Sequence, residues 1–123
     1  MIHLDTSFLI RVLETGSPEN QKLRTWVREG EEFSMSTIAW TEFQCGPLDR
    51  SDIESAAAII DDYRQFTSEH ASLAARLFNQ SGRIRGSLTD CMIAATAIAD
   101  GAPLATADAG DFRRLQDSGL SLA

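Results

Sequence analysis

Four carboxylates stand out as candidates for shared chemistry: Asp5, Glu42, Asp90 and Asp108. Asp5 and Asp108 each follow a short apolar run, and Asp90 opens the small-residue segment that leads to Asp108. Carboxylates that meet at one place raise one another's pKa values unless a cation neutralises them. Oxygen ligands in this number favour Mg²⁺ or Mn²⁺. Such an ion polarises a phosphoryl oxygen and makes water nucleophilic, so the acids indicate hydrolysis of a phosphodiester.

Three of these acids also fit a purely structural role at the start of a helix. Asp5 could cap a helix over residues 6–14, and Asp108 could cap the helix that follows it. Residues 87–90 (SLTD) fit a capping pattern that would account for Asp90. This alternative stays open for each acid taken alone, whereas the four acids together favour a metal site.

Glu42 is harder to explain as a structural residue. It shares a helical stripe with Ile38 and Cys45, so we expect it to be half-buried. Glutamates are seldom buried without a partner. A hydrogen-bonded structural glutamate remains the alternative to a ligand.

Short apolar runs alternate with helical patterns along the chain, which predicts an α/β domain with a mainly parallel sheet. In such a sheet ligands bind at the carboxyl ends of the strands. The four acids should all map to that edge. The expected strands are residues 2–5, 33–36, 63–66 and 103–106, with 120–122 as a candidate fifth.

Helix signals separate these strands. Ser17-Pro18 is typical of an N-cap followed by proline in the first turn. Residues 51–54 (SDIE) resemble a capping box, and residues 69–80 have a helical apolar stripe. The helix after the capping box has its own stripe, formed by Ile53, Ala56, Ala57 and Ile60.

Composition narrows the class of protein. At 123 residues we expect one domain, residues 1–123, and no apolar run is long enough for a membrane span. The N-terminus carries Asp5 and no basic leader, so it does not resemble a signal peptide. Cys45 and Cys91 lack metal-site spacing, and we expect both to be small buried residues in a reducing, cytoplasmic setting.

Charge gives weaker guidance. The net charge of −7 argues against a strongly nucleic-acid-binding surface, although a bound cation would change the local balance. Arg83 and Arg85 precede Asp90 and could hold phosphate, with a solvated loop as the alternative. His3 and His70 have no metal-ligand spacing, so we expect both to be structural.

The ordered set of motifs resembles the PIN-domain ribonucleases, specifically the VapC toxins of bacterial toxin–antitoxin modules. The resembling segments cover nearly the whole chain: IHLDTSFLI, MSTIAWTEFQCG and LTDCMIAATAIADGAPLATADAGDF. By this resemblance the four acidic positions of the family fall on Asp5, Glu42, Asp90 and Asp108. The positions that support them fall on Ser7, Thr106 and Asp111.

The resemblance implies a three-layer α/β/α fold and a Mg²⁺- or Mn²⁺-dependent endoribonuclease. It also implies a homodimer inhibited by a small VapB-type antitoxin, with RNA as the substrate. The alternative is a non-catalytic metal- or protein-binding module such as a receiver-like signalling domain. A receiver needs paired acids after its first strand and a lysine after its fifth, whereas this chain has Asp5 alone and no lysine after Lys22.

Overall fold

The computed structural model describes all residues from 1 to 123 and has a central four-stranded sheet. All its pairings are parallel and the strand order is β3-β2-β1-β4, as the alternating pattern predicts. The strands are β1 (Ile2–Leu4), β2 (Phe33–Ser36), β3 (Asp62–Arg64) and β4 (Leu104–Ala105). The candidate fifth strand is reduced to a single bridge between Leu104 and Leu122.

Seven α-helices and a 3₁₀ segment connect the strands. The first four helices are α1 (Thr6–Val12), α2 (Pro18–Arg28), α3 (Thr37–Gln44) and α4 (Arg50–Ile59). The others are α5 (Ser68–Gln80), α6 (Leu88–Ala99), α7 (Ala109–Phe112) and the 3₁₀ segment η1 (Arg113–Ser118).

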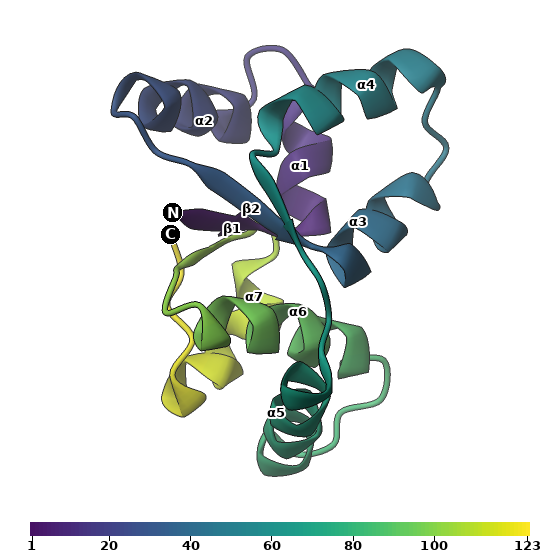
Figure 1. The fold of residues 1–123 in the computed structure, drawn as a ribbon, viewed down its shortest axis with the longest axis vertical. Coiled ribbons are helices and arrows are strands. Elements are labelled where there is room, and N and C mark those ends of the chain that lie inside the picture. The colour runs from purple at the N-terminus through teal and green to yellow at the C-terminus, as the bar shows by residue number, and fades with distance from the viewer.

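The helices form layers on both sides of the sheet. Helices α1, α2 and α4 lie above it, and α5, α6 and α7 lie below it (Figure 1). Helix α3 contacts α1 on one side and α6 on the other (Figure 1). The architecture is therefore the predicted three-layer α/β/α arrangement.

Helix α6 is the most buried helix of the lower layer. Its Ala94, Ala95, Thr96 and Ala97 are fully buried, which explains the small residues of this segment. Small side chains let a helix lie close to its neighbours, and Thr96 satisfies its hydroxyl by bonding to the Met92 carbonyl at 3.1 Å. This close packing fixes the start of α6, where Asp90 lies.

Several local predictions hold and one does not. Ser17 caps α2, accepting from the Asn20 amide at 3.0 Å. The capping box of α4 begins at Asp49 and closes on Asp52, two residues before the predicted position. An aspartate caps a helix as well as a serine does. The chain therefore offers two overlapping capping patterns, one from Asp49 and one from Ser51, and the structure uses the one from Asp49.

The predicted cysteine environments are half right. Cys91 is buried in the core, whereas Cys45 is exposed just past the end of α3. The expectation for Cys45 was wrong because the stripe chosen for α3 is not the face that packs.

No helix is both long and apolar enough to cross a membrane.

Candidate functional site

The structure brings together the four candidate carboxylates, although they come from segments far apart in the chain. Asp5 follows β1, Glu42 lies on α3, Asp90 lies in the first turn of α6, and Asp108 follows β4. All four line one pocket of about 220 Å³, which we call the acidic cleft. Its other lining residues are Thr6, Ser7 and Ile10.

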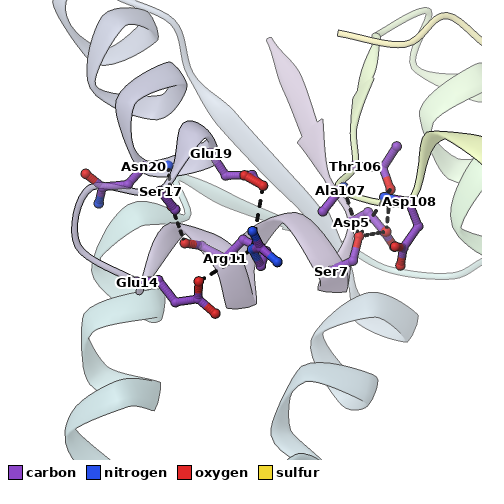
Figure 2. Close-up of polar contacts among 10 residues, drawn as sticks. All are labelled: Asp5, Ser7, Arg11, Glu14, Ser17, Glu19, Asn20, Thr106, Ala107 and Asp108. Atoms are coloured by element: carbon purple, nitrogen blue, oxygen red, sulfur yellow. Dashed lines mark hydrogen bonds and ion pairs between the residues drawn. The ribbon is translucent and has the colours of Figure 1, made fainter.

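Asp5 is the best-anchored of the four acids. Only 5% of its surface is exposed, and its Oδ2 accepts from the hydroxyls of Ser7 at 2.6 Å and Thr106 at 2.9 Å (Figure 2). Burial raises the pKa of Asp5, and the two hydroxyls oppose that rise. Its side chain makes no capping bond to α1, so the capping alternative does not explain it.

The same hydroxyls tie Asp5 to the segment that carries Asp108. Ser7 accepts from the Ala107 amide at 3.0 Å, and Thr106 accepts from the Asp108 amide at 3.0 Å (Figure 2). The side chain of Asp108 makes no capping bond to α7. Hydrogen bonds between the segment that follows β1 and the segment that follows β4 therefore fix the position of Asp108 relative to Asp5.

Asp90 carries the strongest electrostatic signal in the cleft. Its pKa is raised to about 6, chiefly by burial and then by the negative charges of Asp5, Asp111 and Glu42. Arg114 opposes the rise. The N-cap residue of α6, Ser87, makes no side-chain capping bond, so the capping alternative does not explain this segment. The cleft therefore holds negative charge that no protein cation neutralises fully.

Glu42 departs from expectation in its burial. It is exposed, because α3 buries Ala39 and Phe43 instead of the predicted stripe. Its carboxylate nevertheless faces the cleft, where Thr6 Oγ1 donates to Oε1 at 3.1 Å. Partial desolvation there raises the pKa of Glu42, and the Thr6 hydrogen bond opposes the rise.

The remaining predicted residues lie outside the lining of the cleft. Arg83 and Arg85 are exposed, and Arg83 Nε bonds to Asn79 at 3.0 Å. This placement agrees with the solvated-loop alternative. Asp111 is exposed, and its charge acts on Asp90 without a direct hydrogen bond between them.

Sequence reasoning missed Arg114. Its Nη1 donates to the Asp111 carbonyl at 2.6 Å, while Nε and Nη2 are buried without a partner. It is the cation whose charge acts on Asp90. The adjacent Arg113 is exposed. Which of the two arginines turns toward Asp90 depends on how η1 is rotated about its axis, and the sequence does not specify that rotation.

The cleft residues fit a hard divalent cation. The titratable side chains that line it are all carboxylates. Burial is the main cause of the raised pKa values of Asp5 and Asp90, and repulsion from neighbouring acids adds to it. No three metal-ligand side chains of the chain form a ready-made cage. The absence of such a cage is compatible with Mg²⁺, because this ion binds one or two carboxylates directly and keeps several waters.

Removing the Ser7 hydroxyl should weaken metal binding. Ser7→Ala takes one of two hydroxyl donors from the buried Asp5 carboxylate, so we expect Mn²⁺ affinity to fall about 10-fold or more. Isothermal titration calorimetry with Mn²⁺ measures this. Ser51→Ala is the matched control, since its hydroxyl also bonds a carboxylate but on exposed α4. Equal Mn²⁺ affinities for Ser7→Ala and the unmodified protein would contradict the role of this hydroxyl.

Comparisons with known proteins agree on the architecture. A family model described as "PIN domain" matches residues 2–117. No curated protein matches the chain. VapBC2 from Rickettsia felis, solved with a DNA fragment from its promoter, has a TM-score of 0.79 at 22% identity, covering 100% of this chain and 98% of that chain.

Two further structures are similar over most of their length. A toxin–antitoxin complex from Klebsiella pneumoniae has a TM-score of 0.73 at 21% identity, covering 91% of this chain and 90% of that chain. VapC20 from Mycobacterium tuberculosis, described as a sarcin–ricin loop cleaving toxin, has a TM-score of 0.70 at 17% identity, covering 100% and 98%. At these identities the likeness is one of fold.

Proposed function

The chain belongs to the PIN-domain family, and from that premise we propose that it is a Mg²⁺- or Mn²⁺-dependent endoribonuclease, the toxin of a type II toxin–antitoxin pair. Nuclease activity is typical of the family. The observation that carries the proposal is the acidic cleft, where four carboxylates from four separate segments line one pocket. The family favours this function over a receiver-like module.

Asp5 and Asp90 are the proposed principal metal ligands, with Glu42 and Asp108 as further carboxylates of the site. When bound, the ion would polarise the scissile phosphate and activate water. Asp5 is suited to this role because Ser7 and Thr106 fix its carboxylate direction. The raised pKa of Asp90 means that a bound cation would relieve repulsion already present in the free protein.

Residues around the carboxylates have supporting roles in this proposal. Ser7 and Thr106 orient Asp5, and Asp111 adds negative charge next to Asp90. Arg114 limits that charge from its half-buried position beside Asp111. Arg83 and Arg85 would contact RNA only at the periphery, because neither lines the cleft.

The test of this function is RNA cleavage by the protein in cells. Brief expression followed by sequencing of newly formed RNA ends should show cuts that an Asp5→Asn variant does not produce. RNA in the cytoplasm is the proposed substrate, and VapC20, which shares the fold, is described as a sarcin–ricin loop cleaving toxin. Identical RNA ends in cells expressing either protein would contradict the proposal.

We also propose a VapB-type antitoxin as the partner of a homodimer of this chain. One of the similar structures is described as a toxin–antitoxin complex and another as VapBC2 bound to a DNA fragment from its promoter. The net charge of −7 and the acidic cleft suit a basic inhibitory segment, with an arginine or lysine placed among the carboxylates.

Co-expression with the product of a small neighbouring open reading frame should abolish toxicity and give a stable complex. Replacing the basic residues of its inhibitory segment with alanine should restore toxicity, because the carboxylates of the cleft lose their counter-charge. Affinity copurification and cell growth measure the two effects. An antitoxin that neutralises equally well without those basic residues would contradict the charge-based mode of inhibition.

A further inference from the structure

A second pocket opens directly beside the acidic cleft. Its volume is about 320 Å³, and we call it the α1 pocket because three of its lining residues lie on α1. The α1 pocket and the acidic cleft share Ser7, Ile10 and Asp108. A molecule bound at the carboxylates can therefore extend into the α1 pocket without a barrier. The other residues lining it are Arg11, Glu19 and Ala107.

Arg11 is the cation of this pocket, and its guanidinium has only two ion pairs and no hydrogen bond within the protein. Its Nε lies 3.5 Å from a Glu14 oxygen and 3.7 Å from a Glu19 oxygen, and its side chain makes no hydrogen bond (Figure 2). The side chain is 48% exposed. The two carboxylates hold the guanidinium in the pocket by charge, while its N–H donors remain available to a ligand.

The backbone at Arg11 is held firmly. Ser17 Oγ donates to the Arg11 carbonyl at 2.6 Å (Figure 2). Asn20 Nδ2 donates to the Val12 carbonyl at 2.8 Å. The end of α1 is thereby fixed to the start of α2. A recognition side chain on a rigid element loses less freedom on binding than one on a loop.

Ile10 supplies the apolar part of the same surface. It is 40% exposed although the chain has few large exposed apolar residues, and it lines both pockets. A phosphate gains nothing from such a surface, and the carboxylates of Glu19 and Asp108 would repel one. A planar, neutral group with hydrogen-bond acceptors on its edge suits the combination of Ile10 and Arg11.

We propose that the α1 pocket binds an unpaired guanine base next to the scissile bond, with the Arg11 guanidinium donating to O6 and N7. This inference rests on the proposed ribonuclease function. The forked donors of arginine match these two acceptors, whereas adenine presents an amino donor in place of O6. Sequence-specific RNA recognition commonly uses unstacked bases in single-stranded segments, which is what an open pocket beside a cleavage site accepts.

The experiment compares the cleavage preferences of three proteins on a pool of RNA oligonucleotides of random sequence, in Mg²⁺. The unmodified protein should favour guanine over adenine at one position flanking the cut by about tenfold or more. Arg11→Gln should lose that preference. Arg50→Gln is the matched control, since it removes the same charge from a 93%-exposed arginine on α4 and should keep the preference.

Two substituted substrates and one further variant test the geometry. Replacing the preferred guanine with inosine keeps O6 and N7 and should leave cleavage nearly unchanged, whereas 7-deazaguanine lacks N7 and should be cut several-fold more slowly. Arg11→Lys keeps the charge without the fork and should also lose the preference. Circular dichroism of the Arg11 variants should match that of the unmodified protein.

The outcomes separate this inference from the function on which it rests. A uniform loss of cleavage across all sequences in Arg11→Gln would identify a phosphate contact and overturn the base-binding proposal. Cleavage without any guanine preference, or an unchanged preference in both Arg11 variants, would also overturn it while leaving the ribonuclease intact. An unmodified protein that cuts no RNA in Mg²⁺ or Mn²⁺ would overturn the proposed function, and this inference with it.

Discussion

Replacing Asp90 with asparagine should lower RNA cleavage by at least about a thousandfold, the loss expected when several kcal/mol of transition-state charge stabilisation is removed. Asparagine has nearly the same shape but carries no negative charge. Asp90 lies in the first turn of α6 and lines the acidic cleft, so the change weakens the proposed metal site without disturbing the core. Initial rates on a fluorescent RNA oligonucleotide measure the effect.

The same substitution should make the metal-free protein more stable at neutral pH. Burial and neighbouring acids raise the pKa of Asp90 from 3.8 to about 6, so ionised Asp90 destabilises the folded state. Because the group is only half-buried, we expect Asp90→Asn to gain on the order of 1 kcal/mol, or a melting temperature about 4 °C higher. Thermal unfolding in EDTA at pH 7.5 measures this gain.

The pH dependence of the gain follows from the sign of the shift. Between pH 6 and pH 4 folded Asp90 binds a proton that the unfolded chain does not, so the unmodified protein becomes more stable as the pH falls. Asp90→Asn lacks this contribution. The difference in stability between the two proteins should therefore be full above pH 6 and disappear as the pH falls toward 3.8.

Asp117→Asn is the matched control for both measurements. Asp117 is an exposed aspartate of η1, and it makes no hydrogen bond or ion pair through its carboxylate. It should change neither cleavage nor the pH dependence of stability. Cleavage by Asp90→Asn at the rate of the unmodified protein would show that Asp90 is not part of the metal site.

The sequence predicted the site best where a residue directly follows a strand or opens a helix. The apolar runs at residues 2–5, 33–36 and 103–106 mark the buried strands β1, β2 and β4. Parallel pairing then places the residues that follow β1 and β4 at one edge. That rule located Asp5 and Asp108, and the start of α6 located Asp90. Strand ends were one or two residues off, because the pairing partner and not the strand itself sets where a ladder stops.

The errors concern which face of a helix packs. The stripe through Glu42 and Cys45 is a valid helical pattern, yet α3 buries the face of Ala39 and Phe43. Both faces contain apolar residues, so local periodicity alone could not choose between them. The buried face of α3 is decided by its contacts with α1 and α6, and these tertiary contacts cannot be read from the local sequence.

Arg114 and Arg11 were missed for a related reason. Arg114 lies in a polar stretch and Arg11 lies between Ile10 and Val12, and neither local sequence distinguishes its arginine from a solvated charge on a helix. Their roles arise from neighbours that fold next to them: two guanidinium nitrogens of Arg114 are buried beside Asp111, and Arg11 shares a pocket with Asp108. Such pairs become visible only when tertiary structure brings distant segments together.

Adding EDTA should abolish RNA cleavage, and adding excess Mg²⁺ or Mn²⁺ should restore it. Calcium is a useful third ion, since it prefers more ligands and a looser geometry than Mg²⁺, and we expect it to restore far less activity. Rates on the same fluorescent oligonucleotide measure all three conditions. Full activity in EDTA after dialysis would contradict a metal-dependent reaction.

The histidines argue for the same chemistry. Ribonucleases that need no metal use a general acid–base pair, most often histidine, to drive the RNA 2′-hydroxyl onto the phosphate. His3 is 1% exposed and bonds to Asp100 at 2.7 Å, and burial lowers the pKa of His3. His70 accepts from the Thr67 amide in the capping box of α5. Neither histidine lines the acidic cleft.

The products should therefore carry a 5′-phosphate and a 3′-hydroxyl. Attack by water in line with the 3′-oxygen breaks the bond between phosphorus and that oxygen, which leaves as a hydroxyl once protonated. The 2′-hydroxyl is not consumed and contributes only to recognition. A 5′-phosphate fragment ligates directly to an adaptor with a free 3′-hydroxyl, whereas a fragment with a 5′-hydroxyl does not. A 2′,3′-cyclic phosphate on the upstream fragment, formed in EDTA, would overturn the hydrolytic mechanism, because that product requires the 2′-hydroxyl as the nucleophile.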